Sequence, residues 1–112
     1  MITGAHFLSY STDADADRTF MRDVLGWHNV DVGGGWLIFR TPPAELAVHP
    51  ADTPSLELYL MCDDLAAEME RLQQQGVEFS EVKHERWGDA TSFKLPSGAS
   101  MGLYQPKHPT AI

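Results

Sequence analysis

Apolar and polar residues alternate along several short stretches of the chain and recur with a helical period along two longer ones. Apolar residues three and four positions apart, such as Phe20, Val24 and Leu25, predict helices over about 16–25 and 65–75. Alternation with a period of two is typical of strands, because successive side chains then point to opposite faces of a sheet. The pattern predicts strands over 4–11, 36–40, 44–49, 56–62, 90–95 and 100–105, with shorter extended pieces over 29–31 and 77–83.

Each predicted helix is preceded by aspartates and followed by a glycine. An aspartate side chain before a helix accepts hydrogen bonds from the free N–H groups of the first turn. Glycine ends a helix readily because it adopts the left-handed conformation at little cost. The candidates are Asp13 or Asp15 with Gly26 for the first helix, and Asp63 or Asp64 with Gly76 for the second.

The chain repeats this order of elements once. An offset of 51 positions separates His6 from Glu57 and also Asp13 from Asp64. A unit that recurs at such a period indicates duplication and pseudo-twofold symmetry. We therefore predict one domain over residues 1–112 with an α+β fold. It consists of two βαβββ modules, about 4–50 and 55–106, with the helices on the outer face.

Composition narrows the class of protein. At 112 residues with 43% apolar and 21% charged residues, the chain resembles ordinary globular domains. No apolar run approaches the roughly 20 residues that span a bilayer, and because the first residues, Met1 to Gly4, have neither a basic nor an apolar region, we expect no secretion signal. The single cysteine, Cys62, excludes an internal disulfide and a thiolate zinc cluster, which fits a cytoplasmic protein. The net charge of −8 argues against nucleic acid as a partner and is compatible with a cationic ligand, although solubility explains it more simply.

Strand alternation separates an aliphatic face from a face that carries chemistry. The aliphatic face packs beneath the helices. The other face mixes imidazole, carboxylate and phenol groups, which together suit a small-molecule or metal site. Its members are His6, Tyr10, Glu45, His49, Glu57, Tyr59 and Tyr104, and Trp87 in the loop 86–89 is a candidate aromatic lid.

Several segments resemble the vicinal oxygen chelate superfamily, which includes glyoxalases, bleomycin resistance proteins and extradiol dioxygenases. The resemblance covers nearly the whole chain and implies two βαβββ modules in a cupped mixed sheet around a central cleft, usually within a homodimer. Its most specific piece is the helix end Asp23-Val24-Leu25-Gly26-Trp27. The other pieces are His6, Arg18 to Arg22, Asp63-Asp64-Leu65, Gly76 to Phe79, Leu95 to Gly98 and Leu103 to Pro106.

In metal-dependent members four ligands come from four strands. The resemblance places these ligands at His6, Glu45 and Glu57, with Gly102 at a position where glutamate is common. Glycine has no side chain to bind a metal, so the set is incomplete. Three such ligands suit one divalent ion such as Zn, Ni, Mn or Fe, with Glu57 or Glu45 as a base, and the alternative is no metal at all.

Each candidate also has an ordinary structural reading. His6 is either a metal ligand or a hydrogen-bonded wall residue. Glu45 and Glu57 are either site carboxylates or solvated groups paired with Arg40 or Arg86. The residues that we predict to contact a small-molecule ligand are Tyr10, His49, Tyr59, Trp87 and Tyr104.

Three functions remain compatible with these patterns. The one we favour is a glyoxalase/bleomycin resistance-like protein that binds a small organic molecule in the sheet cleft, with weak or no metal. The second is a divalent-metal-dependent lyase, isomerase or dioxygenase acting on a vicinal-oxygen substrate. The third is a structural or regulatory homodimer without chemistry.

Overall fold

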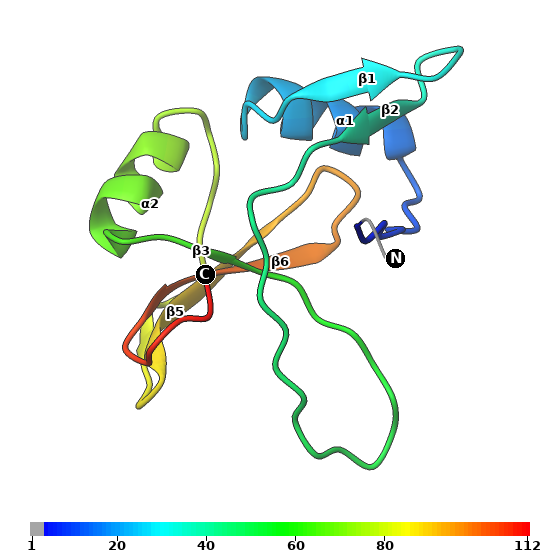
Figure 1. Cartoon of the computed structure of the whole chain (residues 1–112). Coiled ribbons are helices and arrows are strands. Elements are labelled where there is room, and N and C mark those ends of the chain that lie inside the picture. Colours follow the sequence, from blue (N-terminus) through cyan, green and yellow to red (C-terminus); the bar gives the residue numbers. More distant parts are fainter. Residues whose placement is uncertain (1–3) are drawn as a thin grey trace.

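The computed structural model describes residues 4–112 and has a mixed α+β architecture. Two helices pack with a four-stranded mixed sheet and a separate two-stranded hairpin (Figure 1). No helix within these residues combines the length and the apolar character needed to cross a membrane.

The second half of the chain forms a strand, a helix and three further strands in the predicted order, although the predicted extended piece 77–83 forms only an isolated bridge at Phe79 and the two-residue strand Lys83–His84. The sheet order is β3-β6-β5-β4, in which β3 and β6 are parallel and the other neighbours are antiparallel. The long hairpin β5–β6 turns at Pro96-Ser97-Gly98, as its turn residues predict. The elements are β3 (Tyr59–Met61), α2 (Leu65–Gln73), β4 (Lys83–His84), β5 (Gly88–Lys94) and β6 (Ser100–Pro106).

The core lies between this sheet and the helices. Leu72 of α2 and Phe93 of β5 are among its most buried side chains, and Met101 and Leu103 of β6 face them. The predicted aliphatic face of the last strand therefore does pack beneath a helix. Gln105, on the same face, accepts a hydrogen bond at 2.9 Å from the free N–H of Leu65 and so fixes the start of α2 on the sheet.

The first half forms a helix and a hairpin. It consists of α1 (Ala14–Asp23) and the antiparallel strands β1 (Asn29–Asp31) and β2 (Leu37–Phe39). Asp13 caps α1 by accepting a hydrogen bond from the Ala16 N–H, as Asp64 caps α2. The chain then leaves α1 through Gly26, which adopts the left-handed conformation.

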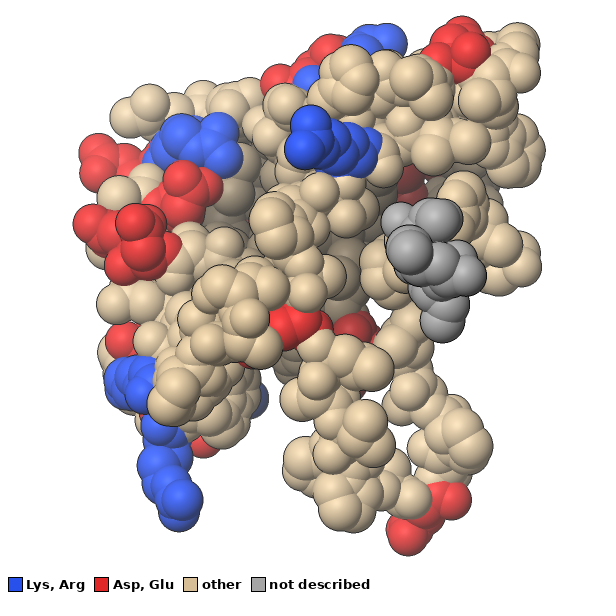
Figure 2. All heavy atoms as spheres, in the orientation of Figure 1, with Lys and Arg blue, Asp and Glu red and all other residues tan. Residues whose placement is uncertain are grey.

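Two strands that the alternation predicts are not formed. Residues 4–11 and 44–49 run as irregular segments without a sheet neighbour, and the predicted strand 56–62 shortens to β3. Leu46 is 81% exposed and Val48 is 90% exposed. A strand requires a hydrogen-bonding neighbour, and within one chain these segments find none. Consequently 40–58 projects from the body as a long limb (Figure 1), with largely uncharged surface (Figure 2).

A polar contact and an aromatic contact join the two halves. Asp17 of α1 is 5% exposed and accepts hydrogen bonds from the Ser97 backbone N–H at 3.0 Å and from the Ser97 hydroxyl at 2.7 Å. The rings of Phe20 and Phe93 lie 6.0 Å apart between α1 and β5. These contacts anchor α1 on the β5–β6 turn, 80 positions away in the sequence.

Candidate functional site

Three aromatic rings meet on the sheet face opposite to the apolar core. Tyr59 of β3 contacts Trp87 and Tyr104 of β6 with ring centroids 6.2 Å and 5.9 Å apart, and Trp87 lies 5.4 Å from Tyr104. All three pairs meet edge to face, the geometry that aromatic quadrupoles favour. Tyr59 and Trp87 are each 43% exposed, so part of each ring is open to a ligand.

His108 completes the cluster from the C-terminal tail. Its ring stacks on Tyr104 with centroids 6.0 Å apart, and its Nε2 lies 3.1 Å from the Tyr104 hydroxyl. We call Tyr59, Trp87, Tyr104 and His108 the aromatic cluster. Sequence reasoning missed His108, because it lies beyond the last strand, where alternation assigns no face. Its position four residues after Tyr104 and two residues beyond the end of β6 was the only available signal.

The cluster brings together three of the five predicted ligand-binding residues. Tyr59, Trp87 and Tyr104 converge, whereas Tyr10 and His49 lie in the irregular exposed segments outside the cluster. The His49 ring instead lies against its own neighbour, with Nδ1 2.7 Å from the carbonyl oxygen of Pro50. The two residues therefore depart from the predicted shared face because their strands are not formed.

Two carboxylates border the cluster, each beside a different tyrosine. Burial raises the pKa of Tyr59, and the nearby Glu57 carboxylate raises it further through its charge and a hydrogen bond. Burial also raises the pKa of Tyr104, and the charge of Glu45 adds to this effect. Glu45 is half-buried and accepts a hydrogen bond from the Ala111 N–H at 3.2 Å. Negative potential next to exposed aromatic faces favours a ligand that carries positive charge.

The tail that carries His108 also borders a shallow, open hollow. This hollow, about 460 Å³, lies between the ends of β3 and β6, and its walls include Met61, Gln105 and His108. A larger hollow along α1, about 670 Å³, contains none of the predicted site residues. The position of the aromatic cluster therefore rests on its rings and carboxylates rather than on the size of a cavity.

The predicted metal ligands do not assemble within one chain. Over residues 4–112, no three His, Cys, Asp or Glu side chains come close enough together to hold a metal ion. His6 is exposed ahead of α1, whereas Glu45 and Glu57 lie beside the tyrosines. The fourth position, Gly102, is covered by the Tyr59 ring: a Cβ at 102 would lie 2.6 Å from Tyr59 Cε1. These donors do not fit the metal centre that the resemblance implies.

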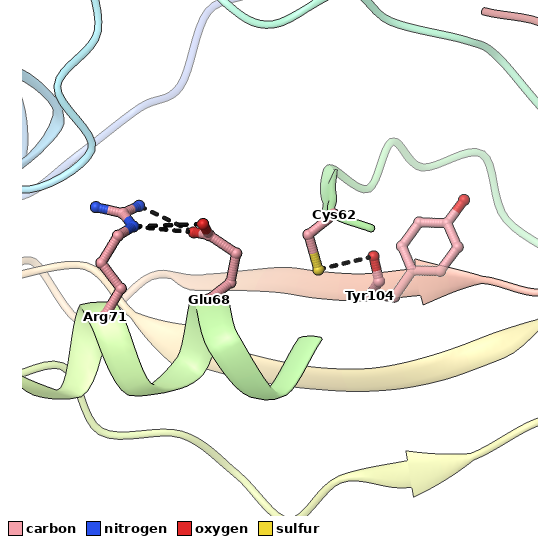
Figure 3. A network of polar contacts seen from close by, with 4 residues as sticks. All are labelled: Cys62, Glu68, Arg71 and Tyr104. Carbon is pink, nitrogen blue, oxygen red and sulfur yellow. Dashed lines mark hydrogen bonds and ion pairs between the residues drawn. The ribbon is translucent and has the colours of Figure 1, made fainter. Parts of the chain in front are cut away.

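Cys62 has a structural position between β3 and α2. Its backbone N–H donates to the Tyr104 carbonyl oxygen at 3.0 Å, and its Sγ lies 3.6 Å from the same oxygen (Figure 3). Burial, with the charges of Glu68 and Asp63, raises the pKa of the thiol to about 11. Glu68 pairs with Arg71 on the surface of α2 at 2.9 Å (Figure 3). Because the reactive form of cysteine is the thiolate, the half-buried Cys62 is a poor nucleophile.

Solved structures share this architecture over nearly the whole chain. The antibiotic binding protein TnmS3 from Streptomyces sp. CB03234 is 27% identical, with 96% of this chain and 99% of that chain covered and a TM-score of 0.69. A glyoxalase/bleomycin resistance protein from the same organism is also 27% identical, with coverage of 85% and 93% and a TM-score of 0.59. A lactoylglutathione lyase from Agrobacterium tumefaciens is 18% identical, with coverage of 92% of each chain and a TM-score of 0.66.

No protein-family model and no curated protein sequence matches this chain. The structural likeness instead confirms the resemblance that the segments around Gly26, Gly76 and Gly98 indicate. The chain has the vicinal oxygen chelate fold, and its structural neighbours are members of the glyoxalase/bleomycin resistance/dioxygenase superfamily.

Proposed function

We propose that this protein binds a small organic molecule with an aromatic ring system at the aromatic cluster, and that binding does not depend on a metal. The observation that carries the proposal is the convergence of Tyr59, Trp87 and Tyr104, whose rings meet edge to face while Tyr59 and Trp87 stay partly exposed. Ligand sites are lined mainly by apolar and aromatic side chains with a few polar groups, and contiguous exposed apolar surface often marks such a site.

The similarity to TnmS3 supports a binding role. That protein is described as an antibiotic binding protein, and it shares the fold over almost the full length of both chains. By analogy, an antibiotic-like aromatic compound is a suitable ligand class for the cluster. The Tyr104–His108 pair supplies a polar group that orients such a ligand, and Glu45 and Glu57 favour a positive charge on it.

The direct test uses 9-aminoacridine, a flat aromatic cation, with acridine-9-carboxylate as an anion that has the same ring system. We expect calorimetry to show binding of the cation, stronger than that of the anion and unaffected by EDTA. Trp87→Ala should weaken this binding about tenfold, because an aromatic contact contributes about 0.5–1.5 kcal/mol beyond its buried area. Trp36→Ala is the matched control, since Trp36 is also exposed but contacts Arg18 near the β1–β2 hairpin.

Two results would contradict this function. The first is a lack of binding by aromatic compounds of either charge. The second is binding of Zn, Ni or Mn at submicromolar concentration that Glu57→Ala abolishes, which would favour a metal-dependent enzyme. Equal weakening by the Trp87 and Trp36 variants would show that the aromatic cluster is not the binding surface.

We also propose that the protein is a homodimer in which a second copy pairs with residues 4–11 and 44–58. These segments carry apolar side chains that face solvent in the single chain, among them Leu8, Leu46 and Val48. They also carry the alternation of strands but lack neighbours, and such unpaired edges are normally covered. Pairing with another chain would complete the first βαβββ module and its pseudo-twofold relation to the second.

Light scattering distinguishes the proposed homodimer from a monomer. We expect a mass about twice the 12.4 kDa of one chain. A mass near 12.4 kDa across micromolar concentrations would contradict the dimer but leave the aromatic cluster, which is built from a single chain, as a separate proposal.

A further inference from the structure

Gly102 and Gly88 differ from the glycines of the turns and helix ends in the reason for their presence. The turn and helix-end glycines, such as Gly26, Gly76 and Gly98, adopt positive φ, where a side chain would be strained. Gly88 and Gly102 do not have positive φ and lie within strands, where glycine weakens a sheet and often marks the close approach of another group. Glycine is therefore needed at these two positions because a neighbouring group leaves no room for a side chain, and not because of the backbone conformation.

At Gly102 the group that approaches is the Tyr59 ring. The two residues are register partners in the parallel pair β3–β6. A Cβ at position 102 would lie 2.6 Å from Tyr59 Cε1, 2.9 Å from Cγ and closer still to Cδ1. Contacts under 3 Å are too short for carbon atoms, so the ring occupies the space that a side chain would need. An aromatic ring that covers a cross-strand glycine in this way also compensates for the side chain that glycine lacks.

Gly88 has the same relation to Tyr104. A Cβ at position 88 would lie 2.9 Å from Tyr104 Cδ2, and only 2.6 Å from the backbone carbonyl oxygen of Gln105. The second contact is with backbone, so a side chain at 88 would disturb the β5–β6 ladder itself. At Gly102, by contrast, the three closest atoms all belong to the Tyr59 ring, which makes Gly102 the cleaner position for a test.

We propose that Gly102 is a positioning residue for ligand recognition: it leaves room for the Tyr59 ring to lie against β6, edge to face with Tyr104 and Trp87. This inference rests on the proposed function and adds the element that sets the shape of the site. A methyl group at 102 would lift the Tyr59 ring from β6 and place it where a flat ligand would lie. The site would then lose its preference for flat aromatic ligands while the core on the other sheet face remained intact.

A double-mutant cycle tests this role with 9-aminoacridine as the probe and calorimetry as the readout. Gly102→Ala and Tyr59→Ala should each weaken binding about tenfold, the scale of one aromatic contact. If Gly102 acts through Tyr59, the affinity of the double variant should also be about tenfold lower than that of the wild type. Once Tyr59 is alanine, there is no ring left for a side chain at 102 to displace. Gly4→Ala is the matched control: among residues 4–112 no atom lies within 4 Å of a Cβ there, and we expect unchanged affinity.

Circular dichroism, which needs no ligand, separates displacement of the Tyr59 ring from loss of the fold. Gly102→Ala should lose near-ultraviolet circular dichroism from the coupled rings and keep the far-ultraviolet spectrum of the wild type. If this variant does not fold, recovery of the far-ultraviolet spectrum in the double variant would support the steric relation, and continued failure would overturn it.

The binding results distinguish this inference from the proposed function. Losses that multiply to about a hundredfold in the double variant, or unchanged affinity in Gly102→Ala, would overturn the role of Gly102 while binding by the wild type still stands. Absence of binding by the wild type would contradict the proposed function and, with it, the inference that rests on it.

Discussion

The contact between Asp17 and Ser97 offers the sharpest test of how the two halves are held together. Asp17 is 5% exposed, and Ser97 donates two hydrogen bonds to its two carboxylate oxygens at 3.0 Å and 2.7 Å. In Asp17→Asn one acceptor oxygen becomes an NH₂ group that faces a donor. Hydrogen bonds to charged groups contribute about 1.5–3 kcal/mol, and a buried donor without a partner is costly. We expect the substitution to lower the free energy of unfolding at pH 7 by about 2 kcal/mol.

The pH dependence of this stability difference provides a second, independent test of the Asp17–Ser97 contact. Burial alone would raise the pKa of Asp17, but hydrogen bonds from the Ser97 hydroxyl, the Ser11 hydroxyl and the Ser97 backbone N–H outweigh burial, and the pKa is lowered from 3.8. A group whose pKa is lower in the folded state stabilises the protein fully above its unfolded pKa. This stabilisation is lost as the pH falls through the folded pKa. The difference between wild type and Asp17→Asn should therefore be constant from pH 7 to about 5 and shrink below 3.8.

Urea unfolding at a series of pH values measures both the loss of unfolding free energy at pH 7 and its dependence on pH. Asp15→Asn is the matched control. The Asp15 side chain is 93% exposed and pairs with Arg18 at 3.1 Å on the surface of α1, so the substitution should cost at most about 0.5 kcal/mol. Ser97→Ala keeps the backbone N–H bond and should cost about half as much as Asp17→Asn. A difference that persists unchanged to pH 2, or equal effects of the Asp15 and Asp17 variants, would refute the reasoning.

Three further changes test the core, the thiol and the exposed limb. Leu72→Ala should destabilise the fold by about 2–5 kcal/mol in urea unfolding, because Leu72 is among the most buried residues, and a loss under 1 kcal/mol would contradict its place in the core. With a pKa of about 11, Cys62 should react with iodoacetamide at pH 8 about a hundredfold more slowly than a thiol of pKa 9, and a rate equal to that of free cysteine would show that it is not shielded. Leu46→Asp should shift the mass in light scattering from dimer to monomer, whereas Ala66→Asp, which adds the same charge on the exposed surface of α2, should leave it unchanged.

Local signals in the sequence sufficed for the helices and for the second module. The capping aspartates and the glycines that end each helix act within a few residues, so the predicted helices 16–25 and 65–75 agree closely with Ala14–Asp23 and Leu65–Gln73. The choice of Asp13 over Asp15 as the cap moved the first helix earlier. Alternation in the last strand also correctly separated the core side of Met101 and Leu103 from the side that carries Tyr104.

Only the tertiary structure decided which strands form and which residues meet. Alternation over 4–11 and 44–49 records a tendency to pair, but pairing requires a neighbour at the right place, and one chain supplies none. Likewise the sequence identified Tyr59, Trp87 and Tyr104 as candidates. Their convergence depends on the parallel register of β3 and β6, which sets Tyr59 opposite Gly102.

Long-range contacts were beyond the reach of sequence patterns for the same reason. Asp17 and Ser97 lie 80 positions apart, and neither residue type signals its partner. His108 joins the aromatic cluster because the tail turns back beside β6, a path that no periodicity encodes. The sequence by itself determined the helices, their ends and the faces of the strands, because those depend on neighbours within a few residues. The tertiary structure alone decided strand pairing and the membership of the aromatic cluster, because those depend on where the folded chain brings distant residues together.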